Sequence, residues 1–385
     1  PSGARTINAG ALEVNLASAG TDRAHGGTYN INGDGSSLRF YGTSSRQIFS
    51  SSQFNFGSSG GGAVTIQQVN PIWRGVTVTT SGGLKNTFTT IGTDLNGQGV
   101  YSQPFTLNVA TGTDPSGVDL EFAGNAGNLK MVKSGAGVMS ITGTANQISG
   151  GIDINAGTLE IAGGGRLNSG DYTGGSRNIL NNAAFVYNST ADQTIGGVIS
   201  GSGTVTKDNS STLTLTGANT YTGDTIINNS GGNFTGGGKL ILANASGAAI
   251  QGNVTIGNNS GGSSGAVLAT TQDNQFGASS VVSFNTSSSG YSYFELRGTQ
   301  QTIAGLDSTG HTNRVTVQNQ ESGTIGAATL TINNTADYTY NGNIRDTWSG
   351  TVGALSIVKD GSGTQTLSGN NTYTGGVTVN DGTLK

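Results

Sequence analysis

The sequence lacks several residue types on which most domains of this length depend. It has no cysteine and only 4 prolines among 385 residues, so no disulfide can brace the fold. Charged residues make up 10% of the chain, whereas ordinary globular domains contain about 25%. No run of about 18 apolar residues occurs, which excludes a membrane-spanning helix. With 17 Lys and Arg against 21 Asp and Glu, there is no basic stripe to bind a nucleic acid.

Glycine, by contrast, is abundant, with 67 residues, and serine, threonine and asparagine crowd the remaining positions. Such a composition is typical either of a disordered chain or of a thin, repetitive β-fold. The net charge of −4 provides little self-repulsion. Apolar residues also alternate with threonine, for example at 212–216, 329–332 and 377–379. This period of two is typical of half-buried strands and favours the β-fold.

Internal repeats organise the chain and are clearest at 129–159, 201–228 and 355–385. Each copy closes on a short strand that ends in asparagine and is followed by a glycine turn. That closing element recurs near positions 7, 78, 154, 227 and 379, which indicates a period of about 75 residues with a degenerate copy near 303. Solenoid coils use roughly 20–30 residues, so each long repeat is expected to form three or four coils of one continuous β-solenoid over residues 1–385.

The two clearest copies share a lysine, an asparagine, a tyrosine and two glycines at matching positions. We interpret them as structural repeat residues: Lys207, Gly217, Asn219, Tyr221 and Gly223 in one copy, and Lys359, Gly369, Asn371, Tyr373 and Gly375 in the other. In the copy at 129–159, Ile148 takes the place of the tyrosine. The copy at 201–228 departs from the pattern at Asn209, where the other copies have glycine.

The segment 359–376 resembles the autotransporter-associated β-strand repeat, also called the passenger-associated transport repeat. The segments 193–228 and, more weakly, 129–159 and 296–306 are similar to it as well. Such repeats occur in the passenger regions of very long bacterial proteins that are secreted or anchored at the cell surface. The resemblance implies an all-β fold, a right-handed parallel β-helix, and an extracellular or cell-surface location.

Side chains that could act in catalysis or bind a metal ion are scarce in this sequence. The two histidines, His25 and His311, have no neighbours at the spacing of metal ligands. The acidic residues are dispersed, and the motif lysine recurs with the repeat, which favours a structural role. We therefore expect no catalytic, cofactor-binding or metal-binding residue, and no enzymatic activity. The aromatic residues Trp73, Tyr101, Tyr291, Tyr293 and Trp348 are expected to pack over coil edges, with stacking on sugars as the alternative.

The chain begins and stops on the same closing element, so we expect a solenoid that is uncapped at both ends. Solenoids normally need caps because terminal coils expose unpaired strand edges. We therefore predict a structural subunit of a surface fibre or stalk that stacks head to tail with itself, or a segment of a longer chain. An adhesin passenger that binds a glycan or a surface is the alternative, and a polysaccharide-active enzyme rests on fold analogy alone. The predicted assembly residues are Ile7, Asn8 and Leu12 at one end, and Val379, Asn380 and Leu384 at the other.

Overall fold

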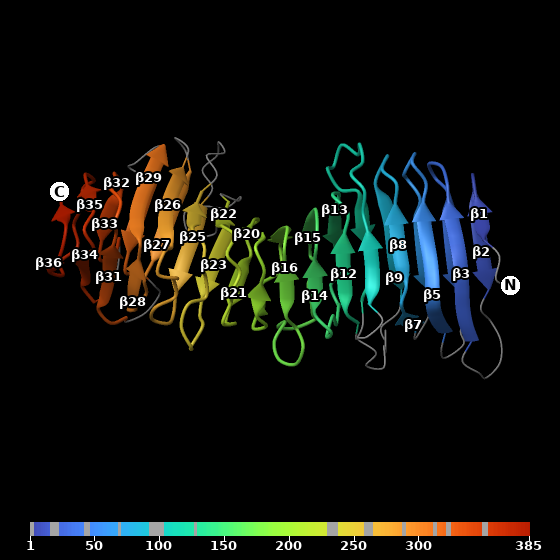
Figure 1. Ribbon diagram of the computed structural model, residues 1–385, viewed down its shortest axis with the longest axis horizontal. Coiled ribbons are helices and arrows are strands. Elements are labelled where there is room, and N and C mark those ends of the chain that lie inside the picture. The colour runs from blue at the N-terminus through green and yellow to red at the C-terminus, as the bar shows by residue number, and fades with distance from the viewer. Residues whose placement is uncertain are drawn as a thin grey trace. The chain divides into compact units, whose positions relative to one another are not determined.

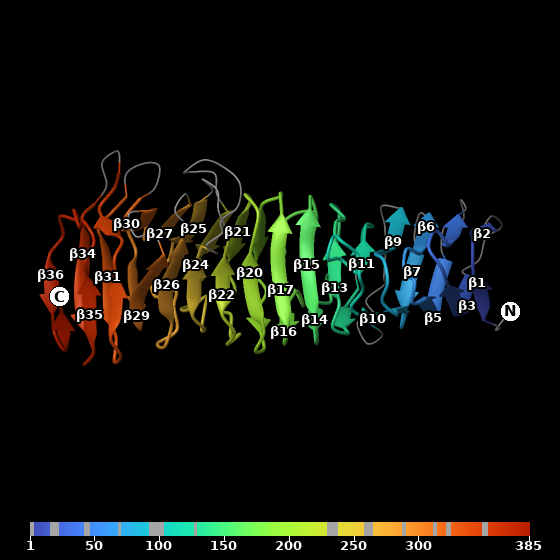
Figure 2. The same ribbon diagram turned by 90° about the horizontal axis from the view of Figure 1, so that it is seen from above.

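The computed structural model describes residues 4–15, 23–41, 47–67, 71–91, 104–126, 129–228, 238–257, 265–286, 290–310, 314–320, 325–348 and 353–385. Two compact units divide the chain, residues 1–191 and 192–385. Within the described ranges the regular structure consists of 37 strands and contains no α-helix. Consecutive coils pair through parallel ladders in both units, so the predicted all-β, parallel β-solenoid is confirmed. Figures 1 and 2 show the strands of each unit lying side by side in successive coils.

Two parallel sheets run along the first unit. One contains β1 (Arg5–Ile7), β3 (Arg23–Ile31), β5 (Gln47–Phe56), β8 (Thr77–Thr80), β10 (Phe105–Asn108), β12 (Met131–Ser134), β14 (Ile152–Ile154) and β16 (Ile179–Asn181), with β7 (Pro71–Arg74) also paired to β5. The other contains β2 (Ala11–Asn15), β4 (Ser37–Tyr41), β6 (Ala63–Gln67), β9 (Asn86–Ile91), β11 (Leu120–Phe122), β13 (Val138–Ile141), β15 (Thr158–Gly163) and β17 (Ala184–Ser189).

The second unit has the same architecture, with its strands distributed over four ladders. The first ladder comprises β20 (Thr204–Lys207), β22 (Thr225–Ile227), β24 (Val254–Ile256), β26 (Val281–Thr286) and β29 (Gly305–Gly310). The second comprises β18 (Gln193–Ile195), β21 (Thr212–Leu215), β23 (Gly238–Leu242), β25 (Gly265–Thr270), β27 (Tyr291–Glu295), β30 (Val315–Gln318) and β33 (Asn343–Arg345). The third ladder comprises β28 (Gln300–Ile303), β31 (Ala328–Asn333), β34 (Leu355–Asp360) and β36 (Val377–Val379). The fourth comprises β32 (Tyr338–Tyr340), β35 (Thr364–Leu367) and β37 (Thr383–Leu384). A short additional strand, β19, spans Ile199–Ser200.

The length of a coil varies with position and is shortest at the repeat motif. One coil takes the chain from Ala11 to its partner Ser37, but only from Val138 to its partner Thr158. Along the strands, buried and exposed residues alternate, as in the sequence Leu355–Asp360. In strands with this alternation one face lies in a narrow apolar interior and the other faces solvent, whereas β25 and β30 are buried along their whole length.

Aromatic rings fill the interior of the first unit where its coils are long. Phe54 is fully buried, and its ring lies 5.2 Å from that of Tyr29 in a stacked arrangement and 5.5 Å from that of Phe88 in an edge-to-face one. Phe88 stacks in turn on Phe122 at 6.0 Å. Tyr29 and Phe54 come from one sheet and Phe88 and Phe122 from the other. Rings from both sheets thus meet in the interior, which explains how the region with the poorest repeat still forms a continuous core.

Truncation of this aromatic column is expected to weaken the first unit strongly. Replacement of Phe54 by alanine removes a ring that touches rings of the coils on either side, so the free energy of unfolding should fall by about 3–5 kcal/mol. Leu84→Ala, at a side chain that is 38% exposed, provides the control and should change it by less than about 1 kcal/mol. Equal effects of the two substitutions in urea denaturation would contradict the continuous core.

Candidate functional site

The repeat motif builds a buried lysine into the turn between two strands. In each copy the lysine occupies the last buried position of its strand: Lys133 in β12, Lys207 in β20 and Lys359 in β34. All three side chains are 0% exposed. Each lies opposite the last residue of the next coil's closing strand: Ile154, Ile227 and Val379 respectively. The three copies therefore share one register, and the lysine is held at the same point in each.

The lysine ammonium groups are surrounded by main-chain carbonyls. Lys133 Nζ donates to the carbonyls of Ser134 at 3.0 Å, Gly135 at 2.8 Å and Ala156 at 3.0 Å. Lys359 Nζ repeats the pattern, with bonds of 2.7 Å to both Asp360 and Gly361 and of 3.3 Å to Asp381. Lys207 donates to Asp208 and, at 2.8 Å, to Asn209. The bonds to Ala156 and Asp381 cross to the turn of the next coil, so the lysine ties two stacked turns together.

Burial makes the charged form of these lysines unfavourable. It lowers the pKa of Lys133 to about 8, and the carboxylate of Asp119 opposes the shift. Burial likewise lowers the pKa of Lys207 to about 8 against the opposing carboxylates of Asp208 and Asp192. Three N–H groups facing three carbonyls favour the protonated form. Lys133 and Lys207 are thus charged at neutral pH and lose their protons in the mildly alkaline range.

The second residue after the lysine has a left-handed backbone in every copy. Gly135 has φ = 75°, Gly361 has φ = 76° and Asn209 has φ = 62°. Asparagine is one of the few non-glycine residues that populate this region readily. The apparent departure of the copy at 201–228 therefore preserves the turn, and with it the carbonyl that accepts from the lysine.

The motif asparagine joins neighbouring coils through its side-chain amide. Asn219 Oδ1 accepts from the main-chain N–H of Ile199 at 2.8 Å, and its Nδ2 donates to the carbonyl of Ala249 at 3.0 Å. Asn371 Oδ1 accepts from the N–H of Ile344 at 3.0 Å. In the copy at 129–159, Asn146 Oδ1 accepts from the main-chain N–H of Ala126 at 2.6 Å. Sequence reasoning missed Asn146 because that copy has one extra residue before it; a search for asparagine within one position of the pattern would have found it.

The motif glycines lie where the backbone of one coil touches that of the previous coil. A Cβ on Gly217 would stand 2.4 Å from the carbonyl oxygen of Gly197, and one on Gly369 would stand 1.7 Å from that of Gly342. Gly223 and Gly375 face carbonyl oxygens at 2.2 Å in the same way. A side chain at any of these positions would push the stacked coils apart.

The motif tyrosine differs between the copies in its surroundings. Tyr221 is fully buried and its hydroxyl pairs with that of Thr225 at 2.7 Å, and burial raises its pKa. Tyr373 is only half-buried. The difference follows from the neighbouring coil, because the strand after Tyr221 is covered by β24, whereas β36 after Tyr373 pairs on one side only.

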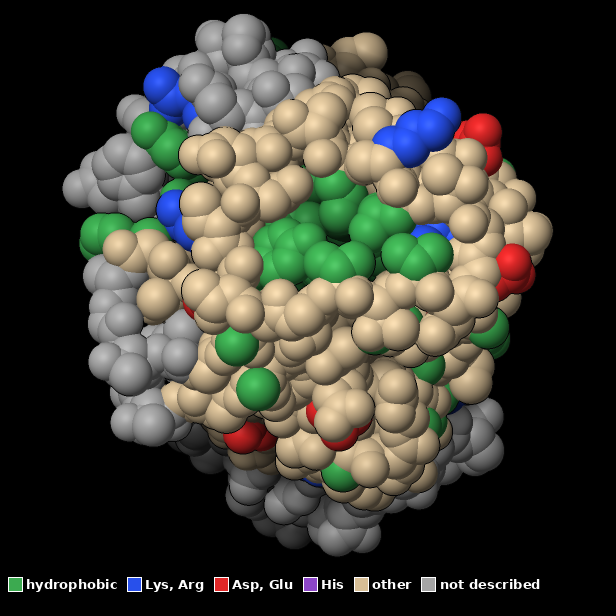
Figure 3. Space-filling view, turned by 90° about the vertical axis from the view of Figure 1, so that its left-hand side faces the viewer, with side chains coloured by type: hydrophobic (Ala, Val, Ile, Leu, Met, Phe, Trp, Pro, Cys, Tyr) green, Lys and Arg blue, Asp and Glu red, His purple; other side chains and the backbone are tan. Residues whose placement is uncertain are grey.

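The coil formed by β36 and β37 exposes apolar side chains that the inner copies bury. Val377 and Val379 are 48% and 50% exposed, while their counterparts in β14, Ile152 and Ile154, are 0% exposed. Figure 3 shows apolar side chains gathered at the centre of this end of the second unit, surrounded by backbone and by side chains of other kinds. This open edge, defined as β36 and β37, presents both unpaired strand groups and uncovered core.

The other residues predicted for assembly lie in the strands and turns at the two ends of the described chain. Asn380 is exposed and donates to Asp360 at 2.8 Å, and Leu384 is half-buried in β37. In the first unit, Ile7 is 7% exposed in β1, Leu12 is half-buried in β2, and Asn8 accepts from the amide of Asn32 at 3.2 Å. Their placement is compatible with a stacking role, which stays a prediction.

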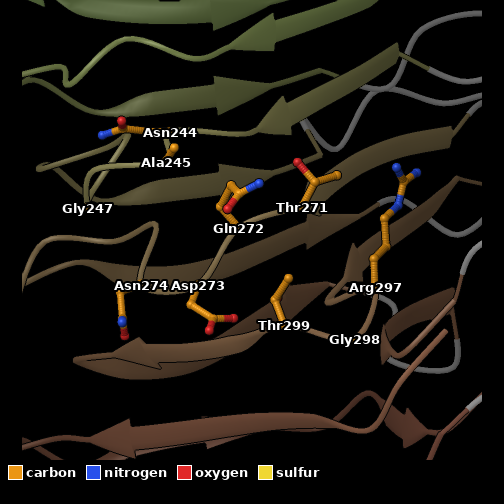
Figure 4. A pocket seen from close by; sticks show the side chains of 10 residues that line it. All are labelled: Asn244, Ala245, Gly247, Thr271, Gln272, Asp273, Asn274, Arg297, Gly298 and Thr299. Carbon is orange, nitrogen blue, oxygen red and sulfur yellow. The ribbon is translucent and has the colours of Figure 1, made fainter.

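A shallow polar pocket of about 500 Å³ lies in the second unit over three successive turns (Figure 4). Beneath it, the buried amide of Gln275 donates to the carbonyls of Asn244, Gly247 and Asp273 at 2.9–3.1 Å. At its rim Asp273 accepts from the N–H of Gln300 at 2.8 Å. The side chains of Gln275 and Asp273 therefore link neighbouring turns by hydrogen bonds. The pocket is lined by Asn244, Ala245, Gly247, Thr271, Gln272, Asp273, Asn274, Arg297, Gly298 and Thr299.

The aromatic residues singled out from the sequence occupy different environments. Trp348 is 62% exposed, and the rings of Tyr291 and Tyr293 stack in parallel with centroids 6.4 Å apart. Tyr101 and His311 lie outside the described residues, as do the side chains of Trp73 and His25. In the described part of the chain, no three His, Cys, Asp or Glu side chains gather as metal ligands would, and no helix has the length and apolarity to cross a membrane.

Comparison with known families identifies the motif. The passenger-associated-transport-repeat model matches residues 131–161, 205–232 and 357–385, the segments that carry the three buried lysines. The resemblance inferred from sequence is thereby confirmed for these copies, while the weaker one at 296–306 stays a prediction. No curated protein and no solved structure shows significant similarity to the chain.

Replacement of a motif lysine by methionine keeps the buried stem but removes the donor. Lys133→Met leaves three carbonyls of two stacked turns without their partner, so we expect the free energy of unfolding at pH 7 to fall by about 1–3 kcal/mol. The stability of this variant should also respond differently to pH. The folded-state pKa of about 8 lies below the unfolded value of about 10.4, so unfolding takes up a proton between these values.

The wild-type free energy of unfolding should therefore rise between about pH 8 and pH 9.5, by about 2 kcal/mol for each such lysine. Above about pH 10 the buried tyrosines act in the opposite direction, because the unfolded state ionises first. Urea denaturation at several pH values checks both points. A difference between wild type and Lys133→Met that does not change from pH 7 to pH 9.5 would contradict the buried, titrating ammonium.

The left-handed turn supplies a further prediction. Asn209→Gly should leave the stability unchanged within about 0.5 kcal/mol, since glycine occupies this position in the other two copies. Asn209→Val should lower it by about 1–3 kcal/mol, because a β-branched residue is strained at this φ. Thermal denaturation followed by circular dichroism distinguishes the two, and a valine variant as stable as the glycine one would refute the assignment of the turn.

Proposed function

We propose, on the premise that this chain carries three passenger-associated transport repeats, that it is a non-enzymatic structural stretch of an extracellular bacterial stalk or fibre. Such repeats are typical of autotransporter passenger regions, which form β-helices and belong to secreted or surface-exposed bacterial proteins. We further propose that the solenoid lengthens when another coil stacks on the open edge, supplied by a second copy of the chain or by further coils of a longer one.

The observation that carries the proposal is the uncovered core at β36. Its two valines are half-exposed, although the same register in the inner copies is fully buried by the coil that follows. A buried valine stabilises a fold by about 1.5–3 kcal/mol relative to an exposed one. Covering this edge with a parallel coil therefore gains apolar burial and completes the main-chain ladder.

The first coil of the chain matches the open edge in its geometry. Three residues separate Val379 at the end of β36 from Thr383 at the start of β37, and three separate Ile7 at the end of β1 from Ala11 at the start of β2. Both turns contain a glycine with positive φ, Gly382 and Gly10. A neighbouring copy can thus place Ile7 opposite Val379 and Ala11 opposite Thr383. Such a head-to-tail contact does not close on itself and produces fibres.

The use of charged residues supports a structural role. Lys133 and Lys359 donate to main-chain carbonyls, and Asp119 accepts from the main-chain N–H groups of Gly112 and Val138. Asp346 likewise accepts from the N–H groups of Leu355 and Thr374. These side chains hold turns together, which is the task of a scaffold.

Disulfide trapping tests the stacking, and the chain suits it because it contains no cysteine. In the proposed register Thr6 of one copy lies opposite Thr378 of the next, at the parallel-strand spacing of about 4.8 Å. That distance is within the range for a disulfide. The double variant Thr6→Cys/Thr378→Cys should form a ladder of covalent oligomers under oxidising conditions, and electron microscopy should show filaments.

The matched control moves one cysteine out of register, as Glu13→Cys/Thr378→Cys, and should give no ladder. Val379→Lys added to the first pair should abolish the ladder, because it places a charge in the apolar contact, whereas the wild-type valine allows it. A chain that stays monomeric at the highest soluble concentration, or a ladder that survives Val379→Lys, would exclude this mode of assembly.

A further inference from the structure

The outer face of β27, β30 and β33 combines aromatic rings with cationic groups. Tyr291, Tyr293 and Glu295 point outward from β27 and alternate with buried residues. Across the ladder, Tyr293 lies opposite Thr316 of β30, and Thr316 lies opposite Asn343 of β33. Glu295 lies opposite Gln318, which lies opposite Arg345. Thr316 and Gln318 of the middle strand are buried, whereas the other residues of this set are partly exposed. We call the partly exposed residues, together with Arg314 beside Tyr291, the tyrosine–arginine face: Tyr291, Tyr293, Glu295, Asn343, Arg345 and Arg314.

Two guanidinium groups flank the tyrosine pair. The Arg314 guanidinium sits 4.6 Å from the centroid of the Tyr291 ring, a distance typical of a cation–π contact. At the other side, Arg345 lies close enough to Tyr293 to lower the pKa of that phenol, although burial raises it on balance. The two rings stack in parallel, with an interplanar angle of 5°, close to both positive charges.

The charge of Arg345 has no carboxylate partner among the residues that the structure describes. Its Nε and Nη2 both donate to the neutral side-chain oxygen of Gln318, at 3.0 and 2.8 Å. The nearby Glu295 is instead paired with Arg297 at 2.9 Å, and the adjacent Asp346 accepts from main-chain N–H groups. A half-buried guanidinium without a counter-charge favours the binding of an external anion.

We propose that the tyrosine–arginine face binds an acidic polysaccharide, a chain of sugar rings that bear carboxylates. The tyrosine rings offer flat apolar surfaces for the faces of sugar rings, and guanidinium groups match carboxylates in a bidentate geometry. Asn343, which is partly exposed in β33, adds an amide group for hydroxyls. This activity is independent of fibre assembly at the open edge.

Calorimetric titration of the full chain with an oligogalacturonate tests the proposal, and the methyl-esterified oligomer provides a ligand of the same shape without charge. We expect the acid form to bind and the ester to bind at least about tenfold more weakly. Arg345→Gln and Tyr293→Leu should each weaken binding about tenfold. Arg39→Gln in the first unit removes one positive charge elsewhere, from an exposed pair with Glu13, and should leave binding unchanged.

Asn343→Asp provides a nearly isosteric variant should Tyr293→Leu fail to fold, since it places a negative charge within the face and should also weaken binding. Circular dichroism of every variant verifies the fold. Three results would overturn the proposal: no binding of the oligogalacturonate by the wild type, equal affinity for the ester, or equal loss on Arg39→Gln. Equal affinity for a polyglutamate of similar length would also overturn it, since the face would then select an acidic peptide or any polyanion.

Discussion

Every coil of this fold needs the next one, because the main-chain groups of parallel strands form their hydrogen bonds along the stacking direction. Each coil is also too thin to bury its own apolar residues, so Ile152 and Ile154 reach full burial only because another coil lies on them. The remaining features of the repeat serve this stacking. Glycine allows the backbones to touch at the corners, asparagine supplies hydrogen bonds where the ladder is interrupted, and lysine closes the turns.

Among these features, burial of the lysine has the largest free-energy cost. A charge without a contacting carboxylate is expensive to bury, and the fold offsets this with carbonyl oxygens from two consecutive turns. Because one of the acceptors belongs to the next coil, the lysine is satisfied only when the coils are correctly stacked. The motif thus couples local turn formation to register, which helps to explain why a lysine recurs at a position where an apolar residue would be easier to bury.

Much of this architecture can be predicted from the sequence, since alternation and recurrence are visible there. The all-β solenoid and the three strongest copies follow from the threonine-rich alternation and from the lysine, asparagine and glycine positions. The partners of Lys133 could not be predicted, because one acceptor, Ala156, lies 23 residues away and contributes only its carbonyl. The amides beneath the polar pocket, such as Gln275, have no repeat to reveal them.

The unpaired charge of Arg345 was equally hidden. Its neighbours Gln318 and Glu295 come from other coils, and only the register shows which of them meet. The aromatic column of the first unit escaped notice for a related reason. Tyr29 and Phe54 are one coil apart in one sheet, whereas Phe88 comes from the other sheet, and the repeat motif is weakest there, so their packing became apparent only from the structure.

Hydrogen exchange of the main-chain amides, followed by mass spectrometry, tests most directly whether each coil depends on its cover. The segments 131–161 and 357–385 carry the same motif and differ in what lies on their closing strand. In dilute solution, the account predicts slow exchange in β14 and fast exchange in β36, and slower exchange in β36 as the protein concentration rises. Equal protection of both strands in the dilute monomer would show that a coil is stable without a neighbour, and would contradict the account.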